Sequence, residues 1–295
     1  MNAMRKIFIV LASTVVLSAS DDDSRGVRDF HVRDESTISR TLHFGGSGQH
    51  VLDVRAIHGS IRVIGADRPD VQLDVQRLVQ AATDDDLDAA DDEVVLDIVD
   101  GEPRIEAIVR EKDGEVCGEE SRRGYGSWQR TRYVVTYEFA IQVPRDTRLR
   151  LCTINGREVL VEGTSGGFEL TNVNGRITMP NMRGSGTAHT VNGPIVAAFT
   201  EQPREPSQFQ TINGDVIVGF PTDLGADLKM KTFNGGLFTD FDVQPLPQPI
   251  AVPERRDGGF VYRSNGFARV RTGRGGPELT FDTFNGSVRV IRFAH

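Results

Sequence analysis

Long hydrophobic runs are scarce in this chain of 295 residues, where the one extended apolar stretch is residues 7–17. This scarcity excludes a polytopic membrane protein. Lysine is scarce too: four lysines accompany thirty arginines, and 34 basic against 42 acidic side chains give a net charge of −8. Because an acidic surface repels a phosphate backbone, we expect no nucleic-acid partner.

Sequence signatures of catalysis and metal binding are also missing. The six histidines show no paired metal spacing, and neither a G-x-S-x-G elbow nor a P-loop is present. The acidic run at residues 84–93 lacks the glycine and the alternating ligands of a calcium loop, and follows Thr83 as the first turn of an N-capped helix would. The sequence therefore predicts no cofactor, no metal and no enzymatic activity.

Residues 1–20 have the three parts of a secretory signal peptide. Arg5 and Lys6 form a positive head, residues 7–17 an apolar core, and residues 18–20 a small-residue cleavage site before three aspartates. The apolar core is too short to span a bilayer comfortably, and no cysteine follows it as a lipid anchor. We expect cleavage after Ser20 and a soluble exported protein without a transmembrane segment, located in the periplasm, at the cell surface or outside the cell.

Only two cysteines are present, Cys117 and Cys152. Export permits a disulfide between them, which on chain-entropy grounds would stabilise the fold by about 3–4 kcal/mol. The alternative is one buried thiol and one loop thiol, because the sequence does not supply the distance between the two Cα atoms.

The second half of the chain is repetitive. Seven of the ten asparagines precede a glycine, and these glycines are spaced 19, 18, 21, 21, 31 and 20 residues apart. Prolines at residues 245–253 mark an inserted loop that explains the spacing of 31. Most units read Thr-x-Asn-Gly, with Asn172 in place of the threonine in one of them. The predicted turn residues are Asn155, Asn174, Asn192, Asn213, Asn234 and Asn285, followed by Gly156, Gly175, Gly193, Gly214, Gly235 and Gly286.

Each repeat contains two short alternating strands and two turns, which fits two architectures. In an antiparallel meander, Asn-Gly closes a hairpin. In a β-solenoid with coils of about 20 residues, equivalent asparagines stack about 4.7–4.9 Å apart and hydrogen-bond along the stack. The recurring register favours the solenoid. We expect Asn174, Asn192, Asn213 and Asn234 to align in a ladder, and Asn213→Leu to cost about 1–3 kcal/mol if that amide is buried.

The sequence divides into four parts. Residues 1–20 are the signal peptide, residues 21–48 a leader segment, residues 49–152 an N-terminal β region with one long loop excursion, and residues 153–295 the solenoid repeats. The excursion carries Arg122, Tyr125 and Trp128. Aromatic rings beside arginine can stack on sugars or acidic ligands, although a lone tryptophan such as Trp128 more often packs its loop down.

Residues 139–144 (Phe-Ala-Ile-Gln-Val-Pro), residues 149–156 (Leu-Arg-Leu-Cys-Thr-Ile-Asn-Gly) and the later Thr-Val-Asn-Gly units resemble the bacterial DUF4097 family. Its members are described as candidate adhesins or β-strand repeat proteins, and the resemblance covers about residues 49–295. It implies an all-β, right-handed β-helix in an exported or envelope-associated protein. It supplies no catalytic residues to transfer.

Three functional hypotheses follow. The favoured one is a non-enzymatic, adhesin-like protein of the cell envelope, a monomer that binds another envelope protein or a glycan or has a structural role. The alternatives are a polysaccharide-acting lyase or hydrolase, which would need clustered carboxylates, and a component of envelope-stress signalling. The residue after Asn-Gly is acidic only at Asp215, so the repeat does not place stacked carboxylates at that position.

Overall fold

The computed structural model describes residues 30–111, 114–115, 117, 132–247, 253–256, 259–262 and 266–293. The predicted signal peptide and the loop residues Arg122, Tyr125 and Trp128 lie outside the described residues. In the described part of the chain, no helix is long and apolar enough to cross a membrane.

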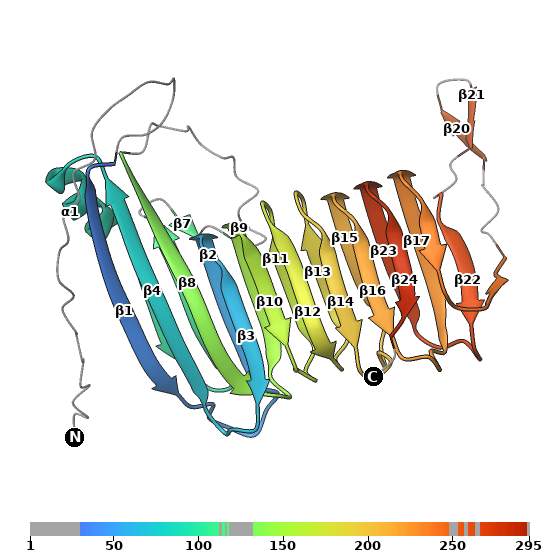
Figure 1. Ribbon diagram of the computed structural model, residues 1–295, viewed down its shortest axis with the longest axis horizontal. Helices are drawn as coiled ribbons and strands as arrows, with labels where there is room; N and C mark the ends of the chain where they lie inside the picture. Colours follow the sequence, from blue (N-terminus) through green and yellow to red (C-terminus); the bar gives the residue numbers. More distant parts are fainter. Residues whose placement is uncertain are drawn as a thin grey trace.

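Two large sheets make up the protein, which is nearly all β as predicted (Figure 1). In spatial order, sheet A contains β1 (Val32–Leu42), β4 (Val71–Ala81), β8 (Tyr133–Pro144), β3 (Ile61–Ala66), β10 (Glu158–Glu162), β12 (Arg176–Met182), β14 (Ile195–Phe199), β16 (Val216–Phe220), β24 (Val288–Arg292) and β18 (Leu237–Thr239). Sheet B contains β19 (Val243–Pro245), β22 (Ala268–Thr272), β17 (Ala226–Asn234), β23 (Glu278–Asn285), β15 (Ser207–Asn213), β13 (Gly186–Thr190), β11 (Phe168–Asn172), β9 (Arg148–Asn155), β2 (Val51–His58), β6 (Arg104–Glu111) and β5 (Val94–Asp100). The short β7 (Gly114–Glu115) pairs with β6, and β20 (Pro253–Arg256) pairs with β21 (Gly259–Tyr262).

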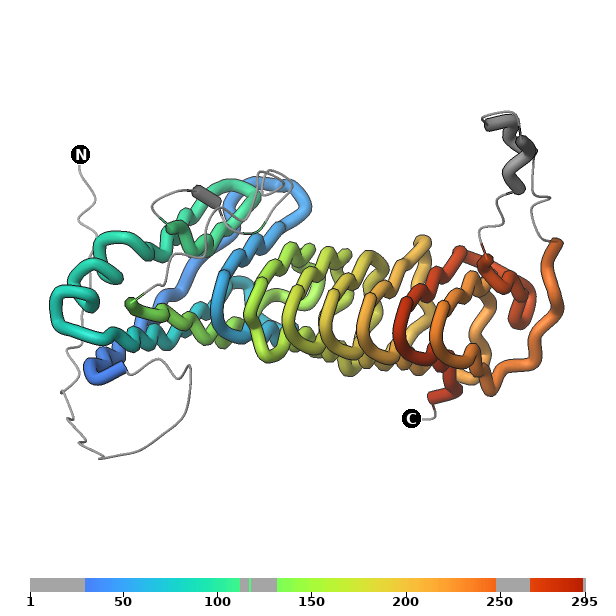
Figure 2. The backbone as a smooth tube through the Cα atoms, turned by 90° about the horizontal axis from the view of Figure 1, so that it is seen from above, coloured from blue at the N-terminus to red at the C-terminus, as the bar shows by residue number. Residues whose placement is uncertain are grey.

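Each repeat gives one strand to each sheet, and neighbouring repeats pair in parallel. Leu170 of β11, for example, lies opposite Leu151 of β9 and Ala188 of β13, while Ile195 of β14 lies opposite Ile177 and Val216. The repeats consequently form a row of successive turns of the chain (Figure 2). This parallel pairing differs from the antiparallel meander considered above, in which the two strands of one repeat would pair with each other.

The last repeat lies out of chain order. Its strands β23 and β24 pair in parallel with β15 and β16 on one side and with β17 and β18 on the other. Residues 278–292 therefore lie between the repeats 207–220 and 226–239, as the red strands of Figure 1 show. Asn213 and Asn234 are therefore not neighbours in the ladder of asparagines, because Asn285 lies between them.

The core fills the space between the two sheets. Alternate side chains of every repeat point inward, and the largest of them form a chain of phenylalanines around Phe209, whose ring contacts those of Phe168, Phe199 and Phe281. Apolar side chains are buried at alternate positions because successive residues of a strand face opposite sides of a sheet.

The N-terminal region continues both sheets. β3 pairs with β8 on one side and β10 on the other, so the region joins the repeats through shared strands. β1, which lies in the segment 21–48 that the sequence assigned to a leader, extends sheet A through eleven paired positions with β4. The expected short helix is present as α1 (Asp84–Glu93), and Thr83 caps it by accepting a hydrogen bond from the Asp86 amide (3.2 Å).

A ladder of threonines, most of them buried, joins the turns of neighbouring repeats. The Oγ1 of each repeat's threonine donates to the carbonyl oxygen of the turn glycine in the neighbouring repeat, for example Thr211 to Gly193 (2.8 Å). The same bond joins Thr153 to Gly59, Thr190 to Gly175, Thr283 to Gly214 and Thr232 to Gly286. Asn172 replaces the threonine in its repeat and donates through Nδ2 to Gly156 (2.9 Å).

The asparagines form a second ladder, on the exposed side of the same turns. Each Nδ2 donates to the Oδ1 of the next asparagine at 2.7–2.8 Å, in the spatial order Asn234, Asn285, Asn213, Asn192, Asn174 and Asn155. The predicted loss of about 1–3 kcal/mol in stability for Asn213→Leu required a buried amide. Asn213 is exposed, so this condition is not met. The turn glycines are needed for close approach: a Cβ on Gly175 would lie 1.9 Å from the carbonyl oxygen of Gly156.

The first prediction concerns the threonine ladder. We expect Thr211→Val to lower the free energy of unfolding by about 1–3 kcal/mol, because it removes the hydrogen bond from the buried Thr211 to the half-buried carbonyl of Gly193 while preserving side-chain shape. Urea denaturation measures the change. Thr187→Val, at an exposed position of β13, is the matched control and should have little effect. Equal losses in the two variants would contradict a special role for the ladder.

Candidate functional site

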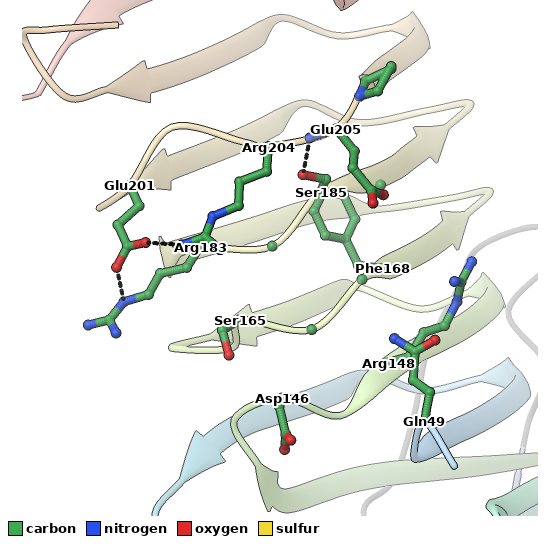
Figure 3. A pocket seen from close by; sticks show the side chains of 15 residues that line it. Gln49, Asp146, Arg148, Ser165, Phe168, Arg183, Ser185, Glu201, Arg204 and Glu205 are labelled. Atoms are coloured by element: carbon green, nitrogen blue, oxygen red, sulfur yellow. Dashed lines mark hydrogen bonds and ion pairs between the residues drawn. The ribbon is translucent and has the colours of Figure 1, made fainter. Parts of the chain in front are cut away.

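A polar groove runs along the loops that lead from sheet A back to sheet B. It encloses ≈ 680 Å³ and spans four successive loops (Figure 3). Its lining consists of Gln49, Asp146, Arg148, Ser165, Gly166, Gly167, Phe168, Arg183, Gly184, Ser185, Gly186, Glu201, Arg204, Glu205 and Pro206. These loops lie at the corner opposite the Asn-Gly turns, because the latter connect sheet B to sheet A.

Glycines at this corner let the loops stack backbone against backbone. A Cβ on Gly166 would lie 2.2 Å from the carbonyl oxygen of Thr147, and one on Gly184 would lie 1.9 Å from that of Gly166. Larger side chains are therefore excluded from these two positions, and the polar side chains of Ser165 and Arg183 occupy neighbouring positions in the groove lining. The result is a regular floor of peptide groups bordered by polar side chains.

The charged side chains of the groove are balanced in number. Three arginines (Arg148, Arg183 and Arg204) accompany three carboxylates (Asp146, Glu201 and Glu205). Arg183 Nε lies 3.7 Å from Glu201 Oε1, and Arg204 Nη2 lies 3.9 Å from Glu201 Oε2 (Figure 3). A balanced set of donors and acceptors suits a neutral, hydroxyl-rich ligand better than a highly charged one.

Unused hydrogen-bonding capacity lies at one end of the groove. Among the described residues, the buried Nε of the lining residue Arg148 has no hydrogen-bond partner, and neither has the buried Oγ1 of the preceding Thr147, which is not part of the lining. Nearby, Arg145 donates to Asp67 Oδ1 (2.7 Å) and to the Gly163 carbonyl (3.1 Å). This guanidinium holds the pKa of the Asp67 carboxyl below its usual range, through a hydrogen bond and its positive charge.

A second exposed feature lies beside the asparagine ladder. The residues that precede the asparagines form an apolar row in which Ile212, Phe284 and Phe233 are 42%, 50% and 69% exposed. The rings of Phe233 and Phe284 stack with their centroids 4.7 Å apart. The row is the outward-facing counterpart of the buried threonines.

The predicted site residues do not converge on one place. The asparagines and their glycines lie at the corner opposite the groove. Cys152 lies in β9 and forms a disulfide with Cys117 (Cα–Cα 5.9 Å), which ties the excursion to sheet B. In the described part of the chain, no group of three or more His, Cys, Asp or Glu side chains could hold a metal ion.

The sequence reasoning missed the groove. A signal was available in Ser165-Gly-Gly167 and Gly184-Ser-Gly186, two small-residue clusters about one repeat apart. They mark the second corner of two repeats, as Asn-Gly marks the first corner of most repeats. The charged residues between them vary from repeat to repeat, so no pattern singled them out.

No known family matches the chain, and no curated protein matches it significantly. Among solved structures, it is similar to a candidate cell adhesion protein from Clostridium sporogenes, with 9% identity, a TM-score of 0.43, and coverage of 88% of this chain and 100% of that chain. A candidate adhesin from Bacteroides fragilis has 9% identity, a TM-score of 0.37, and coverage of 88% and 97%. A candidate lipid binding protein from Parabacteroides distasonis has 10% identity, a TM-score of 0.24, and coverage of 88% and 97%.

Proposed function

We propose that this chain is an exported, adhesin-like protein of the bacterial cell envelope that binds a neutral glycan along the groove. In this proposal it is a member of the DUF4097 family with a right-handed β-solenoid fold, and it has no enzymatic activity. The observation that carries the proposal is the charge-balanced groove that extends across four loops, two of which line it with glycines. An extended ligand can follow such a groove from one repeat to the next.

The chemistry of the lining favours hydroxyl groups as ligands. Arginine offers several donors in one plane and carboxylates offer acceptors, so the pair can bind neighbouring hydroxyls of a sugar. The enzyme alternative requires two carboxylates poised on a scissile bond. Of the three carboxylates in the groove, Glu201 forms ion pairs with Arg183 and Arg204, so Asp146 and Glu205 are the pair that this alternative would use.

The test is titration of neutral oligosaccharides, prepared from bacterial capsule or envelope glycans, into the protein by calorimetry. We expect Arg183→Ala to weaken binding by about 10- to 100-fold, because a hydrogen bond to a charged group contributes about 1.5–3 kcal/mol. Arg183 is half-exposed and its ion pair is on the surface, so the fold should be retained.

Arg289→Ala on the outer face of sheet A is the matched control, because it removes an exposed arginine that is not part of the groove lining. It should bind like the unchanged protein. Equal affinity of Arg183→Ala and Arg289→Ala would show that the glycan binds elsewhere. Shortened oligosaccharides after incubation would instead favour the polysaccharide-acting enzyme.

A further inference from the structure

The out-of-order repeat, residues 278–292, lies between the repeats 207–220 and 226–239. We call its position the slot and the two flanking repeats its walls. Asn285 donates to Asn213 (2.8 Å) on one wall and accepts from Asn234 (2.7 Å) on the other. Thr283 donates to the Gly214 carbonyl (2.8 Å), while the Gly286 carbonyl accepts from Thr232 (2.7 Å). Residues 278–292 thus complete both ladders across the slot.

The walls would also fit each other. Thr232 and Asn234 on one wall carry the same groups as Thr283 and Asn285, so the repeat 226–239 could make against 207–220 the bonds that 278–292 makes now. Residues 226–239 are also synthesised before residues 278–292. The two walls therefore carry the groups needed to pair with each other directly if residues 278–292 are not between them.

The inserted repeat cannot remain in water once it leaves the slot. Its four inward side chains, Leu279, Phe281, Val288 and Val290, are completely buried. The Phe281 ring stacks on that of Phe209 at 5.5 Å and meets that of Phe220 edge-on at 6.4 Å. Exposing this much apolar surface is unfavourable, so a displaced repeat needs an equivalent slot.

The connection that leads into the slot, residues 273–277, crosses another loop of the chain at close range. Residues 273–277 pass over the loop 221–225, and the two backbones meet at glycines. A Cβ on Gly276 would lie 2.3 Å from the Gly225 carbonyl oxygen, and one on Gly273 would lie 2.8 Å from that of Leu224. Gly273 and Gly275 adopt φ angles of +56° and +75°, which glycine reaches most readily. The two segments therefore approach each other through backbone at glycine positions.

We propose that residues 278–292 are an exchangeable repeat, and that the slot between 207–220 and 226–239 also accepts this repeat from a second copy of the chain. The partner is a second copy because it supplies both the inserted sequence and an equivalent vacant slot in return. Mutual exchange preserves every ladder bond and every buried contact of the repeat. The exchanged dimer is thus joined by the same contacts that close the monomer.

The experiment uses two full-length single variants, Gln210→Cys and Asp282→Cys, mixed below the unfolding temperature and then mildly oxidised. Positions 210 and 282 are direct partners on β15 and β23 and face away from the core. Adjacent strands are about 4.8 Å apart, within reach of a disulfide. We expect a disulfide-linked heterodimer of twice the chain mass, in greater yield than random collision gives, because exchange places one copy's β23 beside the other copy's β15.

Two controls make the result decisive. His189→Cys mixed with Asp282→Cys should give no heterodimer, because His189 pairs with Gln210 and lies one strand further from β23. The double variant Gln210→Cys/Asp282→Cys should form its disulfide within one chain. If the double variant closes and the mixture gives no heterodimer, or no more than the His189 control, exchange does not occur. If the double variant fails to close, residues 278–292 do not occupy the slot.

Discussion

Phe209→Ala is expected to lower the free energy of unfolding by about 3–5 kcal/mol. The Phe209 ring is completely buried and has ring neighbours from three other repeats: Phe168 at 6.4 Å, Phe199 at 5.9 Å and Phe281 at 5.5 Å between centroids. Removing it creates a cavity that rigid, hydrogen-bonded sheets cannot readily close. Urea denaturation followed by circular dichroism measures the loss.

Phe233→Ala is the matched control for this prediction. Phe233 also stacks on another phenylalanine, but its side chain is 69% exposed, so truncation should change stability by only about 0.5 kcal/mol. A Phe209 variant as stable as the Phe233 variant would mean that the interior can rearrange around the missing ring.

Removing both cysteines, by Cys117→Ser with Cys152→Ser, is expected to lower the free energy of unfolding by about 3–4 kcal/mol. The disulfide joins residues separated by 35 positions, and cross-linking a loop of that length restricts the unfolded chain. The measurement compares denaturant midpoints of the variant and the unchanged protein, with and without reductant. Reductant should destabilise the unchanged protein and leave the variant unaffected. Equal midpoints without reductant would contradict the prediction.

The sequence predicts the parts of this fold better than their arrangement. Alternation and turn residues predict the strands, and Thr83 followed by three aspartates predicts α1. The position of residues 278–292 could not be predicted, because Thr283 and Asn285 make the same bonds beside either neighbour. The local sequence pattern determines the strands and turns of a repeat. The connection through Gly273 and Gly276 determines where residues 278–292 lie among the other repeats.

For the candidate site, the sequence predicts the repeating turns but not the groove. The Asn-Gly turns were found because they repeat, yet their asparagines are exposed and the buried bonds come from the threonines two residues earlier. The groove is formed by residues that do not repeat, such as Arg148, Arg183 and Glu201, which come together only because successive loops stack. Side chains brought together by stacking of different repeats leave no periodic mark in the sequence.

The asparagine ladder also gives the molecule an electrical direction. All of its side-chain amides donate the same way, from Asn234 toward Asn155. Their dipoles add instead of cancelling, as peptide dipoles do along a helix, and each bond polarises the next. The Asn155 end of the row is therefore relatively positive and the Asn234 end relatively negative, so an ion moving along this edge encounters a gradient of potential with a fixed sign.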